Sequence, residues 1–433
     1  MKSFLRFLLV LVLIAIIGAG GFLLWAANVP AIDPIAAPQR ASLASDKIDA
    51  GELLVAVGDC VVCHTAEGGQ DFAGGLPLPT PFGTIHSTNI TPDAETGIGT
   101  WSEAAFRRAM REGIDREGNY LYPAFPYDHF TKTSDDDIGA IYAYLMSQPA
   151  HPAPAAENGL PFPFNIRLLM AGWNLLFLDK GAYQPDSSHD AAWNRGAYLV
   201  EGLGHCGACH TPRNLLGAEK SGERFAGGEA EFWHAPALNQ AAPAPAGWTE
   251  DALVNYLIDG WDEDHGVAAG PMTPVVDALA QLPEDDVYAI ATYLLSFIGE
   301  QPADKAEKAR AFAAEREFPV TPPSPEANPD TAAVRGEATF LRACATCHKS
   351  GGEIVPLALS STVAGPDPRN VIHIVIDGIK PPAGSSDKTM PAFGQTLSDE
   401  QITDLVGFVR SRFSDKPAWA DVAAKVREAR SEN

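Results

Sequence analysis

The chain contains one five-residue pattern three times, and its residue types are suited to covalent and metal chemistry. In each copy two cysteines lie three positions apart and a histidine follows directly. The copies are Cys60-Val61-Val62-Cys63-His64, Cys206-Gly207-Ala208-Cys209-His210 and Cys344-Ala345-Thr346-Cys347-His348. Cys-x-x-Cys-His is the attachment pattern of c-type haem, in which both thiols bind the porphyrin and the histidine ligates iron. The chain is therefore expected to bind three covalent haem c groups and to move single electrons.

Zinc binding and dithiol redox chemistry are the alternatives for a cysteine pair. All six cysteines of the chain lie in the three patterns. A four-cysteine zinc site would use two pairs and strand the third, and a redox dithiol does not require a histidine after every pair. No cysteine remains for a structural disulfide. The residue set therefore favours haem c.

The charge of the chain limits its partners. The formal net charge of the 433 residues is −24 at pH 7. A polyanion would repel such a surface, so nucleic acid is not an expected partner. The length suggests two to four domains.

The N-terminus has the composition of a membrane anchor. Lys2 and Arg6 precede a mostly apolar run without charge at residues 7–25, close to the roughly 20 residues that span a bilayer. A cleavable signal peptide has a shorter apolar core of about 7–15 residues, but the glycine-rich residues 18–21 keep cleavage as the alternative. Positive residues before the span place the N-terminus in the cytoplasm. We expect a bacterial inner-membrane protein with a single anchor and its haem domains in the periplasm.

The sequence around the haem patterns repeats, which indicates tandem domains. Each repeat is expected to contain a helix leading into the haem pattern, a middle helix ending at Gly113, Gly260 or Gly378, and a last helix with an acidic first turn. Ser102 and Thr249 have the residue types of helix N-caps. The fold class is therefore predicted to be all-α, with three tandem class I cytochrome c domains after an N-terminal transmembrane helix. The expected first helices cover residues 49–64, 194–210 and 335–348, and the last helices cover 134–146, 283–298 and 398–413.

The predicted domain organisation has seven segments. They are a membrane anchor (1–28), cytochrome c domain 1 (45–150), a linker with an apolar segment (151–190), domain 2 (191–300), a Pro-rich linker (301–330), domain 3 (331–415) and a tail (416–433). The apolar segment at residues 166–177 is too short to span a bilayer. It is expected either to pack between domains or to contact a partner or the membrane surface. The tail is expected to be a solvated helix.

Methionine is the usual second axial ligand of a class I haem. Met272 and Met390 follow the middle helices of the second and third repeats in loops beside proline, and are the predicted ligands there. The equivalent loop of the first repeat has Phe125, which cannot ligate iron. Met110, within the middle helix, is the favoured ligand for this haem, with His129 as the alternative and an open or water-bound iron as a third possibility.

Five further residues are candidates for contacts with haem propionates. They follow from matching positions in the repeats, and plain structural roles are the alternative for each. They are Arg213, Trp101, Trp248, Asn89 and Asn239.

The motifs resemble those of a known family, the trihaem cytochrome subunits of bacterial membrane-bound dehydrogenases. The resemblance lies in Gly74-Gly75-Leu76-Pro77-Leu78-Pro79-Thr80-Pro81-Phe82-Gly83-Thr84-Ile85, Ser87-Thr88-Asn89-Ile90-Thr91-Pro92-Asp93, residues 204–214 and Gly270-Pro271-Met272. It extends over about residues 47–413. It implies an electron-transfer subunit of an oxidoreductase complex, with no substrate site of its own, that passes electrons to ubiquinone or a terminal oxidase.

The loop with Phe125 and Asp128-His129-Phe130 is more similar to the molybdenum-hydroxylase branch of this family, whose members serve aldehyde, nicotinate or isoquinoline oxidation. That resemblance implies a molybdopterin large subunit and a [2Fe–2S] small subunit as partners. The alternatives are the cytochrome subunit of a pyrroloquinoline quinone alcohol dehydrogenase or of a flavin gluconate or sorbitol dehydrogenase. A free-standing cytochrome and a haem peroxidase are the remaining alternatives.

Overall fold

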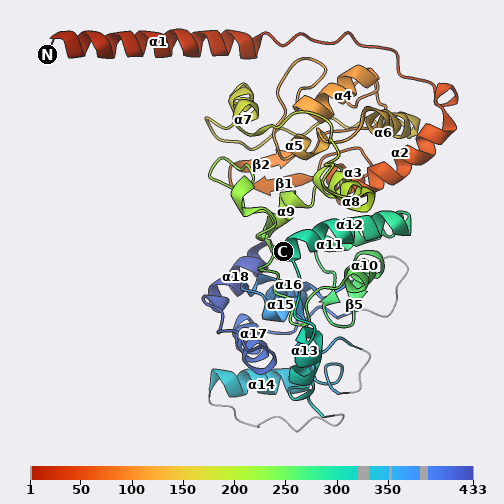
Figure 1. The fold of residues 1–433 in the computed structure, drawn as a ribbon, viewed down its shortest axis with the longest axis vertical. Helices are drawn as coiled ribbons and strands as arrows, with labels where there is room; N and C mark the ends of the chain where they lie inside the picture. The colour runs from red at the N-terminus through yellow and green to blue at the C-terminus, as the bar shows by residue number, and fades with distance from the viewer. Residues whose placement is uncertain (1, 320–330, 351–353, 381–388, 433) are drawn as a thin grey trace. The chain divides into compact units, whose positions relative to one another are not determined.

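The computed structural model describes residues 2–319, 331–350, 354–380 and 389–432. The chain divides into two compact units, residues 1–184 and 185–433 (Figure 1). The helices of the first unit are α1 (Lys2–Ala27), α2 (Ser45–Val57), α3 (Cys60–Cys63), α4 (Glu103–Glu112), α5 (Tyr127–Phe130), α6 (Asp135–Ser147) and α7 (Leu169–Phe177). The helices of the second unit are α8 (Ala191–Glu201), α9 (Gly207–His210), α10 (Glu250–Asp259), α11 (Met272–Leu279), α12 (Glu284–Ile298), α13 (Lys305–Ala314), α14 (Ala332–Ala343), α15 (Ser361–Ala364), α16 (Arg369–Asp377), α17 (Asp399–Phe413) and α18 (Val422–Glu432).

Helix α1 contains the apolar N-terminal run. Its segment Phe4–Ala27 is long and apolar enough to cross a bilayer, with a mean hydropathy of 2.9. A signal sequence would have the same properties. The helix is therefore consistent with the expected anchor and equally with the cleavable alternative.

Three helix crossings repeat along the chain, and a glycine permits each of them. The helix before each haem pattern packs on the last helix of the same repeat, in the pairs α2 with α6, α8 with α12 and α14 with α17. A Cβ atom on Gly51, Gly196 or Gly336 would collide with a backbone carbonyl oxygen of the partner helix. The three glycines lie eight to ten residues before the first cysteine of their haem patterns. The same close crossing thus recurs at an equivalent place in each repeat.

Replacing Gly336 with alanine is expected to destabilise the third repeat, because the new methyl group would overlap the carbonyl of Asp404 in α17. Overpacking of this kind costs about 1–3 kcal/mol of unfolding free energy. Gly407, also in α17, has open space around its Cβ position, so Gly407→Ala is the matched control and should stabilise by up to about 1 kcal/mol. Thermal unfolding of the haem-loaded proteins measures both. Equal melting temperatures for the two variants would contradict the close crossing.

The predicted caps of the middle helices are confirmed. The Ser102 side chain accepts a hydrogen bond from the Ala105 N–H at the start of α4, and Thr249 does the same for α10. Gly113 and Gly260 end these helices with φ of 61° and 70°. These are left-handed conformations that glycine adopts at little cost.

The expectation of a continuous helix running into the haem pattern is wrong for the first two repeats. Helix α2 stops before Asp59, whose φ is 49°, and α3 starts anew at the first cysteine. In the second repeat α8 ends at Glu201, and His205 has a φ of 36°. Helix α14 ends at Ala343, directly before the third pattern.

Two segments expected to be outside the domains are packed against the third repeat. Helix α13 lies in the predicted linker, and its Ala309 and Ala313 belong to the same apolar cluster as Phe340. The tail forms α18, whose Val426 is fully buried in that cluster, so the expectation of a solvated tail is wrong. The proline-rich part of the linker, from residue 320 to 330, lies outside the described residues.

Short antiparallel hairpins add to the helices, a feature that the all-α prediction did not include. Strands β1 (Pro77–Thr80) and β2 (Gly83–His86) pair with Leu78 opposite Ile85, and β3 (Gly228–Ala230) and β4 (Trp233–Ala235) pair with Glu229 opposite His234. A third hairpin joins β5 (Trp261–Asp262) to β6 (Gly266–Val267). Each hairpin is two-stranded, so the architecture remains largely helical.

Candidate haem-binding sites

The cysteines of each pattern are held close together on one turn of chain. Cys60 and Cys63 are the ends of α3, Cys206 and Cys209 lie at the start of and within α9, and Cys344 and Cys347 follow α14. None of the six is in a disulfide. Burial, with the neighbouring Cys63, raises the pKa of Cys60 to about 12, and burial does the same for Cys344. These thiols are therefore neutral before haem attachment.

The predicted proximal histidines are oriented by backbone carbonyls in two of the three patterns. His64 Nδ1 lies 2.6 Å from the Thr88 carbonyl oxygen, and His210 Nδ1 lies 2.7 Å from that of Pro236. A carbonyl only accepts hydrogen bonds, so each Nδ1 carries the proton and Nε2 is left as the metal ligand. Burial also lowers the pKa of His64, His210 and His348. The neutral imidazole that iron requires is thereby favoured.

The segment of β4 connects the second haem pattern to the third repeat. The carbonyl of Pro236, the residue directly after β4, holds His210, while the His234 backbone exchanges two hydrogen bonds, of 2.9 and 2.8 Å, with the side chain of Asn370 in α16. The Trp233 ring stacks on His373 of α16, with centroids 4.9 Å apart and planes at 22°. One short segment thus contacts both repeats.

The two methionines predicted as axial ligands lie at equivalent places but in different local structure. Met272 is the first residue of α11, so it begins a helix rather than lying in the expected loop. Met390 is in an extended segment that exchanges backbone hydrogen bonds of 2.9 and 3.1 Å with Ile379. Both are partly buried. Their role as iron ligands stays a prediction.

Both candidate ligands of the first haem are buried. Met110 is 4% exposed on the inner face of α4, beside Phe106 and Ala109. His129 is 7% exposed in α5. Phe125, in the place of the methionine, packs its ring 5.3 Å from that of Phe130. The aromatic packing around Phe125 gives this residue a structural role, and the sixth ligand remains a choice between the two buried side chains and water.

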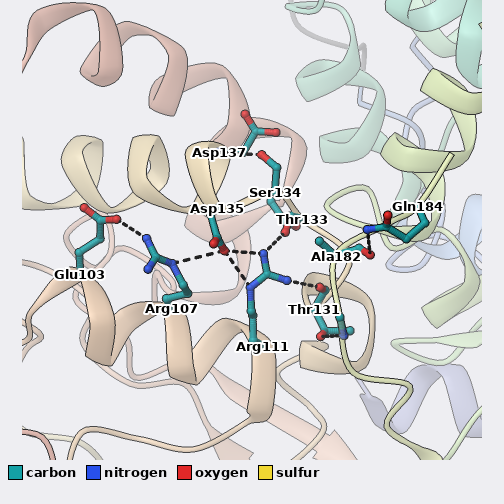
Figure 2. Close-up of polar contacts among 11 residues, drawn as sticks. Glu103, Arg107, Arg111, Thr131, Thr133, Ser134, Asp135, Asp137, Ala182 and Gln184 are labelled. Carbon is teal, nitrogen blue, oxygen red and sulfur yellow. Dashed lines mark hydrogen bonds and ion pairs between the residues drawn. The ribbon is translucent and has the colours of Figure 1, made fainter. Parts of the chain in front are cut away.

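A network of ion pairs and hydrogen bonds fixes the two elements that carry these candidates (Figure 2). Arg111, next to Met110, donates to the carbonyls of Thr131 and Thr133, just after His129, at 2.7 Å each. It also pairs with Asp135 of α6 at 2.7 Å, and this hydrogen bond lowers the pKa of the Asp135 carboxyl. The end of α4 is therefore tied to the segment that follows α5.

Three of the five propionate candidates, Asn89, Arg213 and Asn239, form side-chain hydrogen bonds within the protein. Asn89 is 3% exposed; its amide donates to Thr96 and to the His151 carbonyl, and its oxygen accepts from Thr91. Arg213 donates hydrogen bonds to the Gly217 and Ala208 carbonyls, and Asn239 donates one to the Arg224 carbonyl. The Trp248 ring stacks on His265, and the backbone carbonyl of Trp101 accepts a hydrogen bond from the Tyr142 hydroxyl. Propionate binding by these residues stays a prediction.

The residues present fit covalent haem. Each pattern offers two thiols that are in no disulfide and a neutral histidine, and each repeat contains a methionine or histidine that is predicted for the opposite face of the ring. Among the described residues there is no cluster of three or more histidine, cysteine or acidic side chains that could hold another metal ion. The arrangement suits a porphyrin that provides iron for one-electron chemistry.

Comparison with known proteins agrees with this chemistry. The family model "Cytochrome c" matches residues 48–149 and 194–297, and the model "Cytochrome C oxidase, cbb3-type, subunit III" matches residues 331–409. The gluconate 2-dehydrogenase cytochrome c subunit of Pantoea cypripedii is 40% identical over 411 residues, which cover 89% of this chain and 90% of that protein. The chain belongs to the family of dehydrogenase cytochrome c subunits.

Two other members of the family differ in length. A nicotinate dehydrogenase subunit of Pseudomonas putida is 49% identical over 408 residues, covering 92% of this chain but only 33% of that protein. This chain therefore spans about a third of that relative. The cytochrome c subunit of the quinone alcohol dehydrogenase of Gluconobacter oxydans is 35% identical over 406 residues, which cover 89% of this chain and 82% of that protein.

As a dehydrogenase cytochrome c subunit, the chain holds haem covalently and transfers electrons. Several residues that shape its sites were not found by sequence reasoning. The carbonyls of Thr88 and Pro236 have no residue-type signature, because any residue supplies a carbonyl. The crossing glycines did have one, since Gly51, Gly196 and Gly336 occupy matching places before the haem patterns.

Proposed function

We propose that this chain is a trihaem subunit that carries electrons from a periplasmic molybdopterin hydroxylase to ubiquinone or a terminal oxidase. The observation that carries the proposal is the threefold recurrence of a Cys-x-x-Cys-His pattern after a helix that crosses the last helix of its repeat at a glycine. Three such units, at residues 45–150, 191–300 and 331–415, would each hold one haem c. Together they would form three tandem cytochrome c domains.

Two observations favour molybdopterin and [2Fe–2S] subunits as partners. The axial loop of the first repeat has Phe125 in place of methionine, with His129 nearby, which is the form that resembles the molybdenum-hydroxylase branch of the family. The relative with 49% identity is named as a subunit of nicotinate dehydrogenase. The substrate of the complex would then be an aldehyde or an N-heterocycle, oxidised on another chain.

A second candidate has support from chain length. The gluconate 2-dehydrogenase and quinone alcohol dehydrogenase subunits are covered to 90% and 82% by this chain. A flavin or pyrroloquinoline quinone dehydrogenase partner would use the same haem units and the same acceptors.

The proposed location is the periplasmic face of the inner membrane. Lys2 and Arg6 precede the uncharged apolar run at residues 7–25 of α1, and positive residues are retained on the cytoplasmic side. The haem units then follow α1 on the periplasmic side, where the anchor keeps them near a membrane-bound acceptor.

Isolation of the tagged chain in detergent from its native membrane, followed by metal and cofactor analysis, tests the proposal. We expect molybdenum, and iron in excess of three atoms per chain, because three haems account for three and an iron–sulfur subunit adds more. Flavin or pyrroloquinoline quinone without molybdenum would replace the hydroxylase by the second candidate. Recovery of the chain alone, with its haems, would contradict a stable complex and favour a free-standing cytochrome.

A further inference from the structure

Helix α7 exposes large apolar side chains that no described part of the first unit covers. Leu175 is 71% exposed and Leu176 is 68% exposed, and Leu169, about two turns before Leu176 on the same side of the helix, is 47% exposed. We call these three residues the α7 face. The helix and its flanks, residues 168–178, contain no charged residue. Soluble proteins rarely leave contiguous apolar surface of this kind without a binding role.

The opposite side of α7 is fixed to the haem-bearing part of the unit, so the helix cannot turn to bury these leucines. Asn174 accepts a hydrogen bond of 2.6 Å from the Tyr127 hydroxyl and donates one of 2.9 Å to the Glu112 carbonyl. Trp173 is 6% exposed, and its ring meets that of Tyr127 edge-on at 5.8 Å. The outward direction of the α7 face is therefore built into the fold.

Helix α7 also packs against the end of the membrane-spanning segment. Ala171 forms an apolar cluster with Ala26 of α1, and Phe22 and Met170 pack against this cluster. The ring of Phe22 lies 3.9 Å from the Cβ position of Gly172, which is between Leu169 and Leu176 on the helix surface. The α7 face is thus continuous with the apolar surface of the span.

We propose that the α7 face inserts into the bilayer surface beside α1 and gives the first haem unit a second membrane contact. This inference rests on the proposed retention of α1 as an anchor. The occupant is the boundary of headgroups and acyl chains, into which amphipathic helices insert by about 5–10 Å. Because the chain carries a net charge of −24, anionic lipid would repel it, and the contact depends on apolar burial in a zwitterionic bilayer.

The contact has a consequence for the first haem site. Tyr127, on which Asn174 and Trp173 pack, belongs to α5 together with His129. With α1 alone in the bilayer, the first unit could rotate about the axis of α1. A second contact through α7 would prevent this rotation. The α7 face would therefore hold this haem site in one orientation to the membrane.

Photo-crosslinking of the full haem-loaded chain in phosphatidylcholine vesicles tests the inference. The probe is phosphatidylcholine with a diazirine in its acyl chain, and the adducts are located by mass spectrometry of peptides. We expect adducts on α1 and on residues 169–177. The variant Leu169→Ser/Leu175→Ser/Leu176→Ser should lose the α7 adducts at least about tenfold while the α1 adducts persist.

The matched control is Leu215→Ser/Leu216→Ser, which removes exposed leucines, 96% and 56% exposed, in the other unit. It should leave the α7 adducts unchanged. Adducts confined to α1 would overturn the second contact while keeping the anchor, whereas absence of α1 adducts would show that the anchor itself is not retained. Adducts on α7 that disappear when the catalytic subunits are bound would assign the α7 face to a protein partner instead.

Discussion

Replacing Cys206 and Cys209 with alanine is expected to remove one of three haems and to interrupt electron transfer through the complex. These two thiols are the predicted attachment points of the second haem, and neither is in a disulfide. Without the thioether bonds, haem is not retained by a small unit of this kind during isolation. Haem absorbance per chain should fall by about one third, because two patterns remain.

The loss of electron transfer follows from the connection of the second pattern to the third repeat. His210 is held by the carbonyl of Pro236, and the strand directly before Pro236, β4, contacts α16 through His234 and the ring of Trp233. A haem bound at His210 would therefore be connected to the third repeat through β4, and electrons could pass from it toward that repeat. Removing it leaves a gap, and substrate-driven reduction of the terminal acceptor should slow at least about tenfold.

Haem content by the pyridine haemochrome method and acceptor reduction by the isolated complex measure the two effects. The variant Leu215→Ala/Leu216→Ala, in an exposed loop of the same repeat, serves as the control and should keep all three haems. Retention of three haems in the cysteine variant would refute attachment at this pattern. Two haems with unchanged turnover would instead place the second haem off the electron route.

The features that could be predicted from the sequence are those specified by local residue types. The haem patterns, the caps at Ser102 and Thr249 and the left-handed glycines Gly113 and Gly260 depend on neighbours within a few residues. The last helices of the repeats have acidic first turns and helical apolar spacing, and their limits agree with α6, α12 and α17 within a residue.

The features that could not be predicted depend on tertiary contacts. The tail is polar on average, yet Val426 and Ala429 are buried against the third repeat, and a few apolar residues in a short helix do not reveal this. The hairpins have two to four residues per strand, too few for an alternating pattern to be recognised. The break before the first haem pattern depends on a left-handed Asp59, which its residue type permits but does not require.

Replacing Met110 with alanine is expected to change the spin state and the potential of the first haem alone. The equivalent methionine loop has Phe125, so the sulfur ligand of this haem would come from α4. Loss of a thioether ligand leaves iron with the proximal His64 and water. The reduction potential of one haem should fall by a sizeable part of the roughly 0.8 V range that axial ligands span.

The matched control is Met146→Ala, because Met146 is a buried methionine of the same repeat, 3% exposed compared with 4% for Met110. Both substitutions create a cavity and should cost about 2–5 kcal/mol of unfolding free energy. Only Met110→Ala should produce a high-spin signal in electron paramagnetic resonance and remove one of the sulfur-to-iron absorption bands. The comparison thus separates ligation from packing.

His129→Ala completes the assignment, since His129 is the other buried candidate and its segment is tied to the end of α4 by Arg111. If Met110 ligates iron, His129→Ala leaves three low-spin haems. A high-spin signal in His129→Ala with none in Met110→Ala would assign the histidine, and this haem would then have a lower potential than its methionine-ligated neighbours. A high-spin haem already present in the unaltered protein would mean that neither side chain binds, and the first iron would then be open to small ligands.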